Sequence, residues 1–342
     1  MITTLSNALG LAPGEAFFWL PMLFMGLLFL IAVANVVFDG FDIGVGCLLP
    51  FATARQRTEM MQRIRPWRDA NELWLLLGLA LFLGAFPKAW SAVMRSLYLP
   101  LTLLGAGVIL RSVAFEFSQR SPLDWRPGWQ HAVAAGSWMT ALSHGLILAK
   151  LSSAYLSGVS YVGLGVFFAL CAVAMYALLG ATWLLSHRDD LLRVSAGGWA
   201  RFCVRWVAAG VIGLSVVLAL SNPGVFIKWG NEPHWSALAG IWGGLLAAFM
   251  LLEFLVSKKA MQHAAIAVLP FFLTLSVVLV VMAGVGYSFF PFLILDDMTV
   301  WDAAASLPAL RLVLAASVIV LPLALGFSLR VYWGLLSRPG GR

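Results

Sequence analysis

The stretch NVVFDGFDIGVGCLLPF, from Asn35 to Phe51, places two aspartates at the end of a long apolar run. Asp39 and Asp42 are three residues apart and have glycines on either side. In an α-helix, one narrow face would carry Asn35, Asp39, Asp42 and Gly46. Lipid does not solvate such a face, so we expect it to contact protein or water. Either the aspartates lie at the water boundary of a closely packed helix, or they act inside the membrane.

The composition is typical of an integral membrane protein. Of the 342 residues, 61% are hydrophobic and 11% are charged, whereas a soluble domain carries about 25% charged residues. Cys47, Cys171 and Cys203 lie in or beside apolar segments without a C-x-x-C pair, so neither a disulfide framework nor a cysteine metal site is indicated. Residues 1–15 contain no Lys or Arg, so the first helix is expected to be retained rather than cleaved.

A membrane helix needs about 20 mostly apolar residues. By this measure the sequence predicts an all-α integral membrane protein with about nine transmembrane helices. The expected spans are 17–38 (continuing toward 50), 72–94, 97–117, 131–152, 159–185, 202–221, 236–256, 263–289 and 309–336. The least distinct division is SAVMRSLYLP, between the second and third spans, where Arg95 would lie at the turn and Pro100 just inside the next helix.

The distribution of basic residues predicts the orientation. With nine helices, one side of the membrane holds the C-terminus and the loops near 51–71, 118–130, 186–201 and 257–262. These loops carry most of the Lys and Arg, whereas the opposite loops hold only Lys88, Arg95 and Lys228. The positive-inside rule therefore places the N-terminus outside and the C-terminus in the cytoplasm. It also accounts for the net charge of +7 without a nucleic-acid partner, for which the sequence has no motif.

Acidic residues gather at the predicted inner ends of three successive helices. They are Asp39 and Asp42 after the first span, Asp69 and Glu72 before the second, and Glu116 at the end of the third. The third span also contains Arg111, a natural counter-charge for one of these acids. Buried charges cost at least about 2.5–3.5 kcal/mol on insertion scales, so they are candidates for function. The cluster is either a structural ion-pair network or an inner mouth for protons.

Of the five histidines, only His144 lies well inside a predicted span. A lone membrane histidine is sometimes a haem ligand, but it is more often a hydrogen-bonded packing residue. The sequence contains no H-E-x-x-H motif and no Walker loop. The segment GFDIGVG ends a membrane helix rather than following a strand, so it does not indicate nucleotide binding.

Four motifs, in this order between residues 36 and 117, point to a family: FDGFDIGVGCLLPF, PWRDANELWLL, AFPKAW and LYLPLTLLGAGVILRSVAFEF. The chain resembles subunit II of cytochrome bd-type quinol oxidases. The resemblance implies a multi-pass protein of the bacterial cytoplasmic (inner) membrane, with two four-helix bundles and a peripheral helix in one polytopic domain, 1–342. The first bundle, with the motifs, would be 16–152, and the second bundle with the peripheral helix would be 159–337.

The resemblance also implies partners. Subunit II pairs as a heterodimer with a subunit I that carries haems of b and d type, and some complexes contain a small single-helix accessory subunit. The complex oxidises quinol and reduces dioxygen to water. Subunit II itself is expected to bind no haem or metal, and quinol, lipids or a structural quinone are its expected small-molecule partners. No catalytic residue is expected in this chain.

By resemblance and topology, the proton path toward the partner's haem would use Asp42, Asp69, Arg111, Asp39, Glu72 and Glu116. The chain departs from the family pattern at Trp67-Arg68-Asp69-Ala70, because the family usually has Trp directly before the acid and Gly directly after it. Arg68 either favours the ionised form of Asp69 or turns outward without effect. The alternatives are a proton-coupled transporter, which usually has polar sites near the middle of the membrane, and a purely structural scaffold for subunit I.

Overall fold

The computed structural model describes residues 10–12, 14–153, 158–187, 190–230, 234–257, 267–295 and 297–336. The first elements are α2 (Ala16–Phe38), α3 (Gly40–Leu48), η1 (Leu49–Phe51), α4 (Ala54–Ile64), α5 (Arg68–Asn71), α6 (Leu73–Ala85), α7 (Pro87–Arg120) and α8 (Arg126–Ser152). The remaining elements are α9 (Val159–Leu185), α10 (Asp190–Ser221), α11 (Pro223–Gly230), α12 (His234–Leu255), α13 (Leu269–Phe289), β1 (Phe292–Ile294), β2 (Met298–Thr299), α14 (Val300–Ala303) and α15 (Leu307–Leu336).

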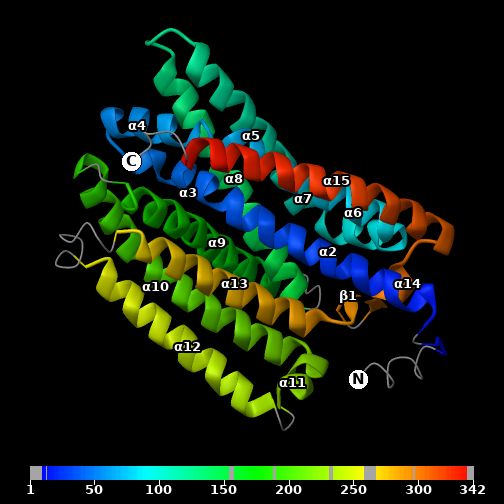
Figure 1. Ribbon diagram of the computed structural model, residues 1–342. Helices are drawn as coiled ribbons and strands as arrows, with labels where there is room; N and C mark the ends of the chain where they lie inside the picture. Colours follow the sequence, from blue (N-terminus) through cyan, green and yellow to red (C-terminus); the bar gives the residue numbers. More distant parts are fainter. Residues whose placement is uncertain are drawn as a thin grey trace.

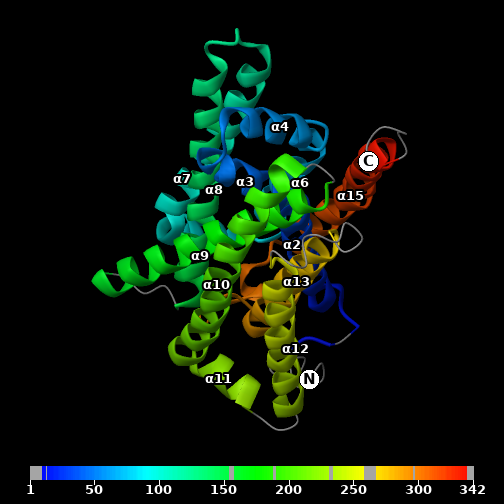
Figure 2. The same cartoon turned by 90° about the vertical axis from the view of Figure 1, so that its left-hand side faces the viewer.

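The long helices lie side by side in one elongated assembly (Figure 1). One end holds α4, α5 and the C-terminal end of α15, and the other holds α11, α14 and the start of α2 (Figures 1 and 2). In the described part of the chain, 8 helical segments are long and apolar enough to cross a membrane. The predicted all-α membrane fold is confirmed, and the orientation of its two ends stays a prediction.

The opening stretch forms an almost continuous helix across α2 and α3. Asp39, between them, keeps a right-handed helical backbone (φ −85°, ψ −17°), and its N–H donates to the Asn35 carbonyl at 2.8 Å. All residues of α3 are buried, because α9 crosses it at Gly44 and Gly180. A Cβ atom on Gly44 would lie 1.8 Å from the Tyr176 carbonyl oxygen, so only glycine permits this approach.

The break between the second and third predicted spans was wrong. The chain turns at Phe86 (φ −129°, ψ 54°), and Pro87 starts α7, whereas Arg95 and Pro100 lie inside that helix. The residue before a proline is disfavoured in the α region, which explains why the turn falls at Phe86. Pro100 is buried within α7 and does not end it. As a result, α6 has 13 residues and α7 has 34.

Two helices extend beyond the predicted spans. Together, α7 and α8 form a hairpin that projects past the rest of the molecule (Figures 1 and 2). Its tip carries the polar residues that the sequence placed in the loop 118–130. Similarly, α10 begins at Asp190, so residues 190–201, expected as part of a linker, are helical. Both extensions are expected where a helix continues from the bilayer into the basic surface region.

The segment after α13 ties the opposite end together. β1 and β2 form a small antiparallel hairpin that the sequence analysis did not predict. In α14, the indole N–H of Trp301 donates to the Phe18 carbonyl at 3.0 Å, and the backbone N–H of Ala305 donates to the Ala85 carbonyl at 2.9 Å. The start of α2 and the end of α6 are thereby held beside the start of α15.

The amphipathic helix α4 covers one end of the membrane helices, the end predicted to face the cytoplasm. Its buried face includes Met60, Met61 and Ile64. The helix begins with a capping box formed by Thr53 and Gln56. The Gln56 amide also donates to the Ser195 hydroxyl of α10 at 2.9 Å, so α4 links the first helices to the second half of the chain. The last helix, α15, lies along α2 and α6 (Figure 1).

Candidate functional site

A buried ion pair joins the opening stretch to α7. One guanidinium nitrogen of Arg111 donates to both carboxylate oxygens of Asp39, at 2.9 and 2.8 Å. The Arg111 side chain is only 2% exposed and that of Asp39 only 4%. Breaking such a pair leaves an uncompensated buried charge, which costs about 3–5 kcal/mol. Asp39 therefore has a fixed cationic partner.

Asp42 is held differently, by an amide rather than by a cation. Its Oδ2 accepts a hydrogen bond from the Asn71 amide of α5 at 2.7 Å. Its Oδ1 is buried and has no hydrogen-bond partner among the described residues, as is also true of Arg111 Nε and Asn35 Nδ2. Most buried polar atoms in proteins bond to protein or to ordered water. Asp42 thus differs from Asp39, both of whose oxygens accept hydrogen bonds from Arg111.

Glu72, between α5 and α6, forms an outer layer of the same cluster. Its Oε1 accepts from the Ser112 hydroxyl at 2.8 Å and pairs with Arg68. The same oxygen is 3.7 Å from Arg111. The Glu72 side chain is 28% exposed, in contrast to the buried Asp39 and Arg111. It connects the buried groups to the surface at the end that carries α4.

Arg68 does not turn outward, because its side chain is buried; its expected effect on Asp69 stays a prediction, since the Asp69 side chain lies outside the described residues. Its guanidinium donates to Ser112 at 2.9 Å and lies 4.4 Å from the Phe115 ring centroid. Burial and the neighbouring Arg111 lower the pKa of Arg68 from its ordinary value, whereas Glu72 acts in the opposite direction. Arginine still remains cationic at neutral pH. Arg68 is therefore a second buried positive charge in the cluster.

The other predicted site residues are Asp69, Glu116 and Trp67. The side chain of Asp69 lies outside the described residues, although its backbone belongs to α5. Glu116 is exposed and pairs with Arg120 on its own helix. Trp67 is partly buried and packs against the hydrophobic core below α4. The structure thus brings together Asp39, Asp42, Glu72, Arg111 and Arg68 and leaves Glu116 apart.

Two contributing residues were missed by sequence reasoning. Ser112 bridges Arg68 and Glu72, and Tyr176 bonds to Nδ1 of His144 at 3.0 Å. The Tyr176 ring also packs beside Gly40, directly after Asp39, where a Cβ would lie 3.5 Å from the ring. Neither a serine next to an arginine nor a tyrosine in an apolar helix carries a distinguishing pattern. His144 is therefore hydrogen-bonded, and its partner Tyr176 packs beside Gly40, the residue after Asp39.

The chain matches the family model described as cytochrome bd terminal oxidase subunit II over residues 20–335. The chain belongs to this family. It is 26% identical to a probable cytochrome oxidase subunit 2 of Haemophilus influenzae, over 91% of this chain and 93% of that relative. It is also 26% identical to the cytochrome bd-I ubiquinol oxidase subunit 2 of Escherichia coli K12, over 90% of this chain and 91% of the relative.

The fold agrees with this assignment. The bd oxidase structure from Geobacillus thermodenitrificans matches with a TM-score of 0.70 at 15% identity, covering 93% of this chain and 99% of that one. The membership in the subunit II family that the sequence motifs predicted is confirmed. As a member of the subunit II family with 8 candidate spans in its described residues, the chain is a multi-pass protein of the bacterial inner membrane.

The cavity beside His144 does not suit a haem. It has a volume of about 510 Å³ and lies between α2, α8, α9, α10 and α13. Among the described residues that line it, His144 is the only histidine, and none is a Lys or Arg that would neutralise haem propionates. Nδ1 of His144 is engaged by Tyr176. Among the described residues, no three His, Cys, Asp or Glu side chains gather as a metal site.

Proposed function

We propose that this member of the subunit II family is a haem-free partner of a haem-bearing subunit I. It stabilises that subunit and helps deliver cytoplasmic protons toward the haem at which dioxygen is reduced to water. The complex as a whole oxidises quinol, and no catalytic residue is assigned to this chain. The family assignment favours this role over a transporter. The observation that carries the proposal is the buried carboxylate of Asp42, which has one free oxygen and no cation bonded to it.

The acids of the cluster divide into two roles. Asp39 is bound to Arg111 and Glu72 to Arg68, so each of these two carboxylates contacts a cation. Within each pair the opposite charges neutralise each other. The Asp39–Arg111 pair also holds α7 against the junction of α2 and α3. Asp42 lacks such a cation, so it is the group that accepts and releases a proton with the least rearrangement. Asp39 therefore acts as a positioning residue and Asp42 as the carrier.

The proton path begins at the partly exposed Glu72. From there the polar groups continue inward through Arg111 and Asp39 to the neighbourhood of Asp42 and Asn71. Ordered water at buried polar atoms usually makes about three hydrogen bonds. Such water would connect the inner carboxylates, which are not bonded to each other in the described contacts. Asp69, from the same short helix as Asn71, is proposed to border this path. Glu116 would contribute only at the surface.

A structural quinone would suit the cavity beside His144. A quinone is uncharged, has a long apolar tail and needs few hydrogen bonds. The cavity walls are apolar apart from the imidazole, which could bind a quinone carbonyl through Nε2. A small accessory subunit, if present, would occupy an outer face of the helix assembly. These two assignments rest on the family resemblance and on the chemistry of the cavity.

The decisive experiment compares Asp42→Asn with Glu59→Gln, both purified together with subunit I. Asn matches the shape of Asp but cannot carry the proton, so turnover should fall while the haem spectrum of the complex is retained. Glu59 is a carboxylate on α4 paired with Arg63 and serves as the matched control. Full quinol-dependent oxygen uptake in Asp42→Asn would remove this residue from the proton path.

A further inference from the structure

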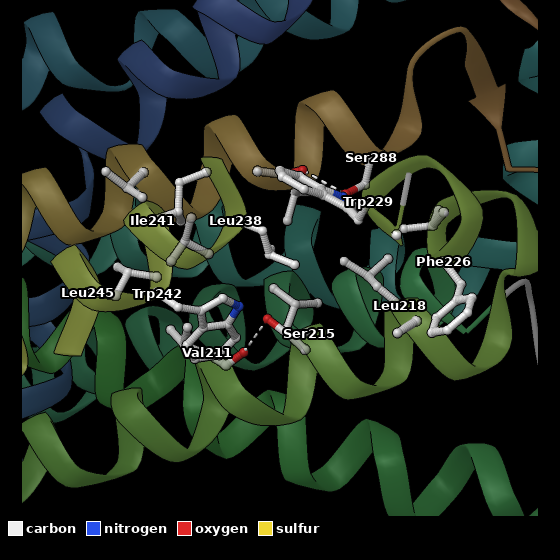
Figure 3. A pocket seen from close by; sticks show the side chains of 18 of the residues that line it. Val211, Ser215, Leu218, Phe226, Trp229, Leu238, Ile241, Trp242, Leu245 and Ser288 are labelled. Carbon is white, nitrogen blue, oxygen red and sulfur yellow. Dashed lines mark hydrogen bonds between the residues drawn. The ribbon is translucent and has the colours of Figure 1, made fainter. Parts of the chain in front are cut away.

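A second cavity lies at the other end of the molecule from the acid cluster. It has a volume of about 310 Å³ and is enclosed by α10, α11, α12 and α13. Figure 3 shows Leu218, Phe226, Trp242 and Leu245 among the side chains that line it. None of the described residues that line it is charged. The end that holds α11 is the one predicted to face the outside.

Most of the polar side chains in its wall bond within the protein, the exception among the described residues being the Trp242 indole N–H. The Ser215 hydroxyl donates to the Val211 carbonyl at 3.0 Å, and the Ser288 hydroxyl donates to the Gly284 carbonyl at 2.7 Å. The Trp229 indole N–H donates to the Ser288 hydroxyl at 3.0 Å. Figure 3 shows Ser215, Ser288 and Trp229 in the cavity wall. A water molecule needs two to four polar partners. A wall of this kind therefore suits a hydrocarbon chain better than water or a polar ligand.

The cavity also lies within the part of the protein that hydrocarbon surrounds. Three of its four walls, α10, α12 and α13, are candidate membrane spans. Near one end, α12 is fastened to α10 by Arg205 and Glu253 at 2.8 Å. At the other end, the Trp235 indole donates to the Gly230 carbonyl at 2.8 Å. Because Gly230 ends α11, this second contact joins α12 to α11. The residues of α12 that line the cavity lie between the two contacts, and lipid chains surround these spans.

Lys228 of α11 directly precedes Trp229, which lines the cavity. Its ammonium donates to the carbonyls of Tyr287 and Phe290, at 2.6 and 2.7 Å, at the end of α13. It also lies 4.1 Å from the centroid of the Tyr287 ring, so it brings a positive charge close to the cavity. Trp235, which lines the cavity, is 61% exposed. Tryptophan and lysine together at a helix end are typical of the headgroup region.

We infer that this cavity binds one phospholipid from the leaflet at this end, with an acyl chain between α10 and α12 and the phosphate beside Lys228. The chain fills space that the side chains of α10, α12 and α13 leave open. The phosphate complements a positive charge on a side of the protein that has few. The inference is independent of the proposed proton path.

Two glycines provide a matched test. Gly284 lines the cavity and Gly243 of α12 does not, and a Cβ atom on either one would meet nothing within 4 Å. Gly284→Leu should therefore fill the cavity, whereas Gly243→Leu should add a side chain elsewhere. Ala219→Phe fills the cavity from the opposite wall and keeps the test valid if Gly284→Leu fails to fold.

The probe is a phosphatidylglycerol with a photoactivatable diazirine on its acyl chain, in vesicles that contain the complete oxidase complex. Cross-linked peptides are measured by mass spectrometry. We expect labelling of the peptides around Leu218 and Trp242 in the wild type and in Gly243→Leu, and several-fold less in Gly284→Leu and Ala219→Phe. Lys228→Gln should lower labelling by this probe but not by a diazirine alkane without a headgroup. Equal labelling in the cavity-filling variants, or none in the wild type, would overturn the inference.

Discussion

Arg111 and Asp39 are 72 positions apart in the sequence, yet one guanidinium nitrogen contacts both oxygens of the carboxylate within 2.9 Å. Their contact joins α7 to the junction of α2 and α3 in a buried environment. We expect Arg111→Met to lower the free energy of unfolding by about 3–5 kcal/mol, because Asp39 is left buried without its partner. Thermal unfolding of the purified complex measures this.

The double variant Arg111→Met with Asp39→Leu separates charge from packing. Replacing both partners of a buried pair by apolar groups is often neutral. The double variant should therefore regain much of the stability lost in the single one. A double variant as unstable as Arg111→Met would contradict the view that the unpaired carboxylate causes the loss.

Glu72 and Glu116 test where the proton path begins. Both are carboxylates near the same end of the molecule, but Glu72 is 28% exposed and lies 3.7 Å from Arg111, whereas Glu116 is 56% exposed and pairs with Arg120. We expect Glu72→Gln to slow quinol-dependent oxygen uptake and Glu116→Gln to have little effect. Proton uptake from the medium, followed with a pH dye during single turnovers, should slow in parallel. The opposite ranking would place the path on the outer face of α7.

Arg68 tests whether the departure from the family pattern is integrated into the site. The charged Arg68 guanidinium donates hydrogen bonds to Glu72 and Ser112. Hydrogen bonds that involve a charged group are worth about 1.5–3 kcal/mol. Because Glu72 is partly exposed, we expect Arg68→Gln to cost an amount near the lower limit. Arg120→Gln, which breaks the exposed pair with Glu116, should cost about 1 kcal/mol or less. Equal losses in urea titrations of the two variants would mean that Arg68 is only a surface charge.

The crossing of α3 and α9 predicts a steric effect. A Cβ on Gly44 would lie 1.8 Å from a backbone oxygen, and backbone cannot move aside cheaply. Overpacking usually costs about 1–3 kcal/mol, and we expect Gly44→Ala to reach or exceed the upper value. Gly26→Ala is the control, since a Cβ there meets nothing within 4 Å. The yield of assembled complex and its melting temperature report the difference.

His187, after the end of α9, predicts a dependence on pH. Burial and the neighbouring Arg63 lower the pKa of His187 below its ordinary value of 6.5, although the Trp183 carbonyl and Glu59 act in the opposite direction. As the pH falls through the ordinary value, the unfolded chain binds a proton before the folded one does, so stability decreases. His187→Gln should reduce the slope of melting temperature against pH between about pH 5 and pH 7. An unchanged slope would contradict this assignment.

The sequence predicted the polar face of the first span because helical spacing alone places Asn35, Asp39, Asp42 and Gly46 together, and all four are buried. It also predicted Arg111 as a counter-charge. It did not determine which acid would pair with Arg111, because Asp39, Asp42 and Glu72 are expected at similar depths in the membrane. That choice depends on how α3, α5 and α7 pack.

The errors have a similar origin. Both Pro87 and Pro100 are able to end a helix, and the backbone of Phe86 rather than the charge at Arg95 decided where the chain turns. The inward orientation of Arg68 depends on Ser112 and Phe115, which are far from it in sequence. The β1–β2 hairpin is too short to leave a periodic pattern. Local sequence thus predicted the elements, and contacts between distant helices decided the details of the site.

The short length of α6 has an electrical consequence. Its 13 residues extend about 20 Å, whereas the hydrocarbon layer is about 30 Å thick. If the turn at Phe86 lies near one membrane surface, Glu72 at the other end of α6 would lie about 10 Å inside the opposite surface. If water reaches Glu72, the transmembrane voltage falls over the remaining 20 Å or so, and the field there is steeper by about half. The length of α6 would then determine how strongly the membrane voltage acts on each proton that moves inward from Glu72.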